Sequence, residues 1–247
     1  MFIKRVEKNK SSNRKILIEL KHVDKFYPMG DNIVKAVNDL SFFVKEGQFV
    51  AVMGPSGSGK STSMNLIGSL DVPTRGTIFL DGVDISTLEE SDLAQVRGRK
   101  IGFIFQSFNL IPNLTAKENI MLPMMFQEIP IEERERKAEE LLELVELEDR
   151  MNHYPNELSG GQMQRVAIAR SLANSPDVIL ADEPTGNLDT RTGDLVMSFL
   201  DKLHKQGKTI IMVTHDPDLA IKHAEIIYWL KDGKLEKITE GKRKKFK

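Results

Sequence analysis

The chain has 247 residues, of which 40% are hydrophobic and 29% charged, a balance that excludes a disordered chain and predicts a globular one with a sizeable core. No apolar run approaches the roughly 18 residues that cross a bilayer, and no apolar stretch follows the basic N-terminus as in a secretory signal. Cysteine is absent, which excludes disulfides and thiolate chemistry. We therefore expect a cytoplasmic protein.

Charge is distributed unevenly along the chain, although the net charge is only −1. Residues 1–15 hold six basic and one acidic side chain, residues 241–247 hold five basic and none acidic, and the rest holds 24 basic and 35 acidic. We expect a basic N-terminal extension and a basic tail, which are either solvated or attracted to anionic lipid headgroups. The acidic body predicts no nucleic-acid partner.

The predicted elements begin with antiparallel strands at residues 16–27 and 36–47, and a further strand of this kind follows at 76–82. Four continuously apolar runs have the character of parallel strands buried on both faces: "FVAVM" (49–53), "IGFIF" (101–105), "VILA" (178–181) and "TIIMV" (209–213). Residues 226–238 read as a hairpin, because Asp232 and Gly233 suit the left-handed dihedrals of a two-residue turn. The fold class is therefore α/β, with a mixed central sheet and an antiparallel β subdomain.

Helices separate the buried strands. Between about residues 107 and 172 the sequence becomes mostly helical, which predicts a helical insertion in the core; within it, Ala138, Leu141, Leu142 and Val145 share one helix face. A later helix should bury one face and stop near Gly207. The residues expected on that face are Leu195, Val196, Phe199, Leu200 and Leu203.

A phosphate-binding loop follows the first buried strand. "GPSGSGKS" has the spacing G-x-x-x-x-G-K-S and precedes a predicted helix, the context that this motif requires. Its glycines let backbone N–H groups converge on phosphate, Lys60 adds a cation, and Ser61 offers a hydroxyl to Mg²⁺. The residues expected to bind the nucleotide here are Gly54, Pro55, Ser56, Gly57, Ser58, Gly59, Lys60, Ser61 and Thr62.

Other polar side chains follow the ends of buried strands. In "VILADEP", Asp182 is placed to hold Mg²⁺ through a water, and Glu183 to orient and deprotonate an attacking water. Gln106 follows the strand at 101–105 and His215 follows the strand at 209–213, so both should open at the same sheet edge. We therefore expect Gln106 and His215 to contact the γ-phosphate, Mg²⁺ or the water.

The order of these pieces resembles the ATP-binding-cassette ATPases throughout residues 16–240. The most specific match is "LSGGQ" (158–162), and "GNLD" (186–189) is a further one. The resemblance implies ATP and Mg²⁺ as ligands, adenine stacking on Tyr27, and a switch role for His215. It also implies that two copies pack head to tail, so that Ser159, Gly160, Gly161 and Gln162 of one copy cap the γ-phosphate held by the other. Asp189 would link the two sites.

Within that family, "ADEPTGNLD" and "GFIFQSFNLIPNLTAKENIMLP" look most like the subgroup serving lipoprotein release, macrolide export and antimicrobial-peptide resistance. This resemblance implies a homodimer on ATP binding, working from the inner face of the cell membrane on a permease with few spans and a large extracytoplasmic domain. Two alternatives stay open: a regulatory module of a division-type complex, and a non-transport protein of the same family.

Residues 107–127 carry many apolar side chains, including Met121, Met124, Met125 and Phe126. Core packing of the helical insertion should account for most of them. The resemblance implies in addition a groove in this region that receives a short permease helix, for which methionines are well suited.

Overall fold

The computed structural model describes residues 14–30 and 32–242, which form two β-sheets and surrounding helices. The larger sheet has six strands in the order β10 (Lys234–Glu240), β9 (Ile226–Lys231), β3 (Phe49–Met53), β8 (Thr209–Val213), β7 (Val178–Asp182) and β6 (Ile101–Ile104). The last five run parallel to their neighbours, and β10 is antiparallel to β9. The predicted mixed sheet is confirmed.

The parallel strands are buried on both faces because successive side chains feed two different cores. In β3, Phe49 and Ala51 join one core, whereas Val50 and Val52 join the other. All five residues of β3 and all five of β8 are buried, which explains their unbroken apolar runs.

One core is closed by a second sheet of four antiparallel strands in the order β2, β1, β4 and β5. Its strands are β1 (Ile16–Met29), β2 (Asn32–Lys45), β4 (Arg75–Leu80) and β5 (Val83–Asp84). Two helices accompany it, α1 (Lys60–Ile67) and α2 (Glu90–Lys100). This is the antiparallel β subdomain that the sequence predicts.

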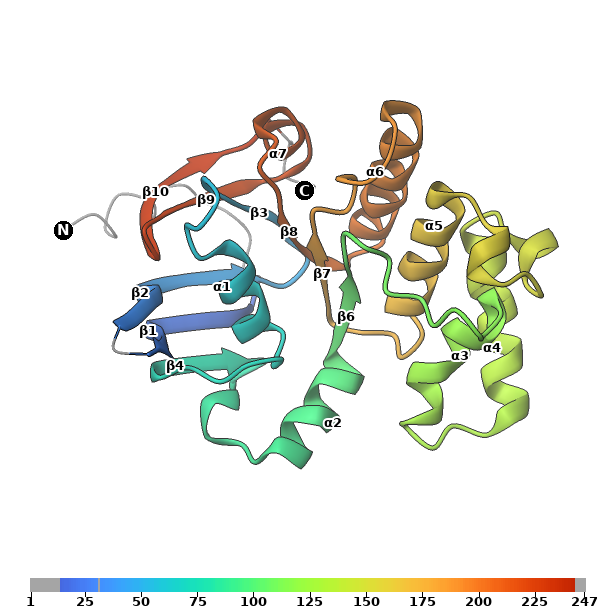
Figure 1. Ribbon diagram of the computed structural model, residues 1–247, viewed down its shortest axis with the longest axis horizontal. Helices are drawn as coiled ribbons and strands as arrows, with labels where there is room; N and C mark the ends of the chain where they lie inside the picture. Colours follow the sequence, from blue (N-terminus) through green and yellow to red (C-terminus); the bar gives the residue numbers. More distant parts are fainter. Residues whose placement is uncertain (1–13, 31, 243–247) are drawn as a thin grey trace.

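The other core lies under helices. These are α3 (Ala116–Met125), α4 (Ile131–Leu144), α5 (Gly160–Ser171), α6 (Thr190–Lys205) and α7 (Pro217–His223), with short 3₁₀ turns at Ile85–Thr87, Glu148–Arg150 and Pro155–Glu157. A capping box between Thr115 and Glu118 fixes the start of α3. Figure 1 shows α3, α4 and α5 gathered at one end of the molecule and β1, β2 and β4 at the other, with β6, β7 and β8 between them.

Several sequence expectations are met in detail, and some are wrong. The predicted face of α4 is buried, and the β9–β10 hairpin turns at Asp232 and Gly233, both at positive φ. Leu195 is 49% exposed, however, because it lies about 140° around α6 from Leu200, and only one of them can face the core. The strand β6 also ends at Ile104, two residues before Gln106.

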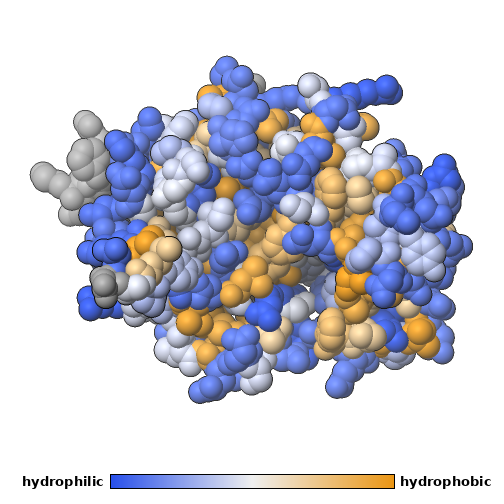
Figure 2. All heavy atoms as spheres, in the orientation of Figure 1, coloured by the Kyte–Doolittle hydropathy of each residue, from blue (hydrophilic) through white to orange (hydrophobic). Residues whose placement is uncertain are grey.

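The methionines of the α3 region divide between core and surface. Met121 and Met124 are one helical turn apart and buried, whereas Met125 and Phe126 are 47% and 65% exposed. Figure 2 shows apolar side chains at the lower right of the molecule, where Figure 1 places the turn between α3 and α4. Core packing therefore accounts for only part of this group.

The basic ends fall mainly outside the described residues, namely at 1–13 and 243–247. Two basic residues of the N-terminal extension belong to the described part of the chain. Arg14 forms an ion pair with Glu225 at 3.1 Å, and Lys15 forms one with Asp81. Over the described ranges, every helix is too short or too polar to cross a membrane.

Leu200 and Leu195 provide a matched test of this packing, since both are on α6 but only Leu200 is fully buried. We expect Leu200→Ala to lower the free energy of unfolding by about 2–5 kcal/mol, because it leaves a cavity. Leu195→Ala should change it by less than about 0.5 kcal/mol. Urea denaturation followed by circular dichroism measures both, and equal losses would contradict the assignment of faces.

Candidate active site

The candidate site lies at the carboxyl edge of the parallel strands, where β3, β6, β7 and β8 all end. The phosphate loop, residues 54–61, continues directly from β3 into α1. Asp182 is the last residue of β7, and His215 follows the end of β8 by two residues. Parallel pairing therefore brings together side chains that are up to about 160 residues apart.

Close backbone contacts shape the phosphate loop. Gly59 has φ 92°, and a Cβ atom there would lie 2.3 Å from the carbonyl oxygen of Ala36, so no other residue fits. The Nζ of Lys60 donates to the carbonyl oxygens of Gly54 at 2.9 Å and Pro55 at 2.8 Å. The loop thus holds its cation beside the backbone that is expected to bind phosphate.

The β9–β10 turn supports the loop from behind. The backbone N–H of Gly233 donates to the carbonyl oxygen of Ser58 at 3.2 Å, and the carbonyl of Gly233 accepts from Asn38 at 2.9 Å. Sequence reasoning identified this turn but not its contact with the loop, because the partners are 175 residues apart.

Asp182, Glu183 and His215 form a connected group. Burial, and secondarily the charge of Glu183, raise the pKa of the Asp182 carboxyl, while the Lys60 charge opposes the rise. The Nδ1 of His215 lies 2.8 Å and 2.9 Å from the two carboxylate oxygens of Glu183. The His215 side chain is 71% exposed, against 20% for Glu183, so the histidine approaches the acid from the open side.

Gln106 contacts the loop that follows Glu183, and Asp189 lies at the end of that loop, where α6 begins. The carbonyl oxygen of Gln106 accepts from the side chain of Asn187 at 2.9 Å, and the Gln106 side chain lies against Gly186. Asp189 caps α6 by accepting from the N–H of Thr192 at 3.1 Å and from its hydroxyl at 2.6 Å. Asn187 was not identified from the sequence, because a loop asparagine carries no motif of its own.

Tyr27 lies in β1, and its hydroxyl donates to Asp71 at 2.6 Å. Burial and this hydrogen bond raise the pKa of Tyr27 to about 12, while a hydrogen bond with Thr62 of α1 opposes the rise. The ammonium of Lys25 lies 5.0 Å from the ring centroid. The structure therefore brings Tyr27 next to the phosphate-loop helix.

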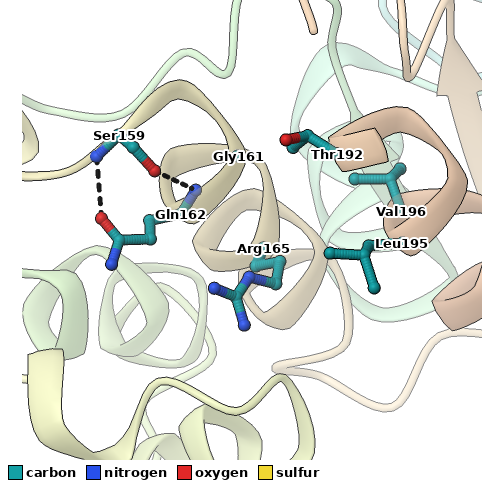
Figure 3. A pocket seen from close by; sticks show the side chains of 7 residues that line it. All are labelled: Ser159, Gly161, Gln162, Arg165, Thr192, Leu195 and Val196. Atoms are coloured by element: carbon teal, nitrogen blue, oxygen red, sulfur yellow. Dashed lines mark hydrogen bonds between the residues drawn. The ribbon is translucent and has the colours of Figure 1, made fainter. Parts of the chain in front are cut away.

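The "LSGGQ" segment opens α5, and Ser159 is its N-cap. Ser159 and Gln162 form a capping box, drawn as the two dashed bonds in Figure 3: the Ser159 N–H donates to Gln162 Oε1 at 2.8 Å, and Ser159 Oγ accepts from Gln162 N–H at 3.3 Å. Thr192, Leu195 and Val196 of α6 face this end of α5 across a small cavity of about 80 Å³. A Cβ atom on Gly161 would lie 2.2 Å from Thr192 Cγ2, so this glycine also lets the two helices approach.

The residues present fit a magnesium ion at this edge of the sheet. Asp182 is a partly buried carboxylate with a raised pKa beside a second acid, and a cation would stabilise its charged form. Ser61 is an exposed residue in the first turn of α1. A hydroxyl and a carboxylate are the hard oxygen ligands that Mg²⁺ prefers.

The sequence matches the family model described as "ABC transporter" over residues 37–186. It is 52% identical to an ABC transporter ATP-binding protein of Thermotoga maritima, over 91% of this chain and 95% of that protein. It is 47% identical to the macrolide export ATP-binding/permease protein MacB of Brucella melitensis, over 89% of this chain but only 34% of MacB.

Solved structures agree with these sequence matches. The fold is similar to the ATP-binding cassette MJ0796 of Methanocaldococcus jannaschii in a dimeric, post-hydrolysis structure bound to ADP and Pi. The TM-score is 0.84 at 49% identity, covering 91% of this chain and 98% of that one.

Gly161 and Gly160 offer a paired test of the α5–α6 contact. We expect Gly161→Ala to lower the free energy of unfolding by about 1–3 kcal/mol, because the new methyl group collides with Thr192. Gly160→Ala should be neutral or stabilising, since its nearest neighbours would lie 3.7 Å away and alanine favours helix. Thermal and urea denaturation of the nucleotide-free protein measure both.

A second change separates the collision from a general helix effect. Thr192→Ser removes only Cγ2 and keeps the hydroxyl that bonds to Asp189. Adding Thr192→Ser to Gly161→Ala should restore most of the lost stability; absence of any recovery would contradict the contact.

Proposed function

Because this chain belongs to the ABC transporter family and is an ATP-binding subunit that hydrolyses ATP, we propose that two copies close head to tail on ATP and drive a membrane permease. The phosphate loop and the "LSGGQ" helix α5 support this, since Figure 1 places α1 and α5 on opposite sides of β6 and β7. In the described chain, the Ser159 side chain bonds within its own capping box rather than to the loop. A second copy would bring the two halves together.

The phosphate-binding half would be built by residues 54–62, with Lys60 compensating negative charge that develops during transfer to water. Bound Mg²⁺, held by Ser61, Gln106 and Asp182, would supply neutralisation of phosphate charge. Tyr27 would stack on the adenine beside α1.

Glu183 would act as the general base. Its carboxylate takes a proton from the water that attacks the γ-phosphorus, the bond to the β-phosphate oxygen breaks, and ADP and phosphate leave. His215, already bonded to Glu183, would orient that carboxylate and contact the γ-phosphate.

The other half would come from α5 of the second copy. A helix N-terminus presents free N–H groups and partial positive charge, which suit a γ-phosphate capped by Ser159, Gly160 and Gly161, with Gln162 completing the turn. Asp189 lies at the start of α6, beside α5, and would carry contacts between the two sites. The dimeric MJ0796 structure bound to ADP and Pi supports this arrangement.

The permease partner would have few membrane spans and a large extracytoplasmic domain, and the pair would act in export from the inner face of the membrane. MacB, whose printed name joins macrolide export with an ATP-binding/permease protein, supports this direction. We propose residues 16–240 as the ATPase domain, with a helical subdomain at about 107–172.

The Glu183→Gln variant tests the dimer mechanism. It should bind ATP and form a stable dimer while hydrolysing at least about 100-fold more slowly than the wild type, because the amide cannot take the proton. Size-exclusion chromatography with light scattering, in ATP and then in ADP, measures the oligomeric state. A variant that stays monomeric in ATP and Mg²⁺ would refute the sandwich.

The exposed side chains of Met125 and Phe126 test the permease surface. We expect the double change to serine to leave ATP affinity and unfolding midpoint nearly unchanged but to weaken co-purification with the permease from native membranes. Met124→Ser is the control for folding, because Met124 is buried and its loss should lower stability instead. Undiminished co-purification of the double variant would place the permease elsewhere.

A further inference from the structure

We infer that Gln164 is a positioning residue, which holds the loop after β7 in the conformation that aims Glu183 at the attacking water. Its side chain reaches out of α5, and the Nε2 amide donates to the carbonyl oxygen of Pro184 at 2.6 Å. This inference rests on the proposed role of Glu183 as general base.

The backbone at Glu183 needs such support. Its φ is 44°, in the left-handed region that residues other than glycine, asparagine and aspartate rarely adopt. The following residue is Pro184, whose ring restricts the backbone of the residue before it. A non-glycine residue persists in this region only where its surroundings fix it, and such positions gather at active sites.

Three hydrogen bonds fix the backbone around Glu183. Its N–H donates to the carbonyl of Val213 in β8 at 2.9 Å, and its carbonyl accepts from the N–H of Gly186 at 2.9 Å. The first bond ties the loop to the sheet, and the second closes a turn within the loop. The third hydrogen bond comes from Gln164, and it connects the loop to α5, which is part of neither the sheet nor the loop.

Core stability does not explain a glutamine at this place. Gln164 is completely buried, and its Oε1 has no hydrogen-bond partner among the described residues. Burying an unpaired amide oxygen is unfavourable, and a methionine or leucine would fill the space without that penalty. What the glutamine offers instead is one directed N–H toward Pro184.

The helix α5 also contacts the segment that follows Gln106. The guanidinium of Arg170 donates to the carbonyl oxygens of Phe108 at 2.8 Å and Asn109, which are two and three residues after Gln106. The N-terminus of α5 is the part that would meet the partner's nucleotide. A shift of α5 on dimer closure would therefore pass through Gln164 to Glu183 of the same chain.

The test is steady-state hydrolysis by Gln164→Met in the full-length protein. Methionine has nearly the same length and volume but no donor. We expect kcat to fall about tenfold or more, since small displacements of a reacting group have large effects on rate, while KM for ATP stays within twofold. ATP-dependent dimer formation, measured in the Glu183→Gln background, should also be unchanged.

Gln48→Met is the matched control. Gln48 is a buried glutamine with a side-chain hydrogen bond, to the N–H of Lys45 at 2.7 Å, but it precedes β3 at the opposite edge of the sheet. Its kcat should stay within twofold of the wild type. An unchanged kcat in Gln164→Met, or an equal fall in Gln48→Met, would overturn the inference.

Two further results keep the inference separate from its premise. Should Gln164→Met not fold, Gln164→Asn, shorter by one methylene, must show the same fall in kcat; misfolding of both would make Gln164 purely structural and overturn the proposal. Normal turnover by Glu183→Gln would refute the role of Glu183 itself, whereas normal turnover by Gln164→Met alone would refute only the positioning role.

Discussion

The constraint on which the rest of the structure depends is the parallel pairing of β9, β3, β8, β7 and β6 with both faces covered. Parallel neighbours must be joined by crossovers, so the chain returns each time over one face of the sheet and leaves every strand at the same edge. The phosphate loop, the two acids at the end of β7 and the histidine after β8 all lie at that edge. The unbroken apolar runs of β3 and β8 follow from the same geometry, because every residue of these two central strands is buried.

At this edge of the sheet, Asp182 feels the charges of both Glu183 and Lys60. The charged form of Asp182 is disfavoured so close to a core, and burial raises the pKa of this carboxyl despite the attraction of Lys60. Glu183 is treated differently, since His215 reaches its carboxylate from the open side. Two neighbouring carboxylates thus have different surroundings: Asp182 is partly buried and feels the charge of Lys60, whereas Glu183 contacts His215. A division between metal holding and proton transfer would require such a difference.

The sequence predicted those parts of the fold that depend on residues close together in the chain. The phosphate loop, the Asp232–Gly233 turn and the buried face of α4 each follow from a motif or a helical period. Leu195 was misplaced because an apolar pair at adjacent helix positions spans about 100°, and the sequence does not say which member faces inward. The roles of Gln164 and Gly161 could not be predicted from the sequence. Gln164 contacts Pro184 and Gly161 contacts Thr192, and in each pair the strand β7 separates the two partners along the chain. Contacts between distant segments carry no periodicity of their own.

The bond between Gly233 and the phosphate loop has a consequence for biogenesis. The strand β3, which leads into that loop, lies between β8 and β9. The loop itself accepts a hydrogen bond from the β9–β10 turn, which comes late in the sequence. Pairings of such long sequence separation form slowly, and a growing chain emerges from its N-terminus first. The most recognisable motif of the protein is therefore translated early but acquires its shape only when the final hairpin arrives, so a truncated nascent chain would carry the motif without the cradle.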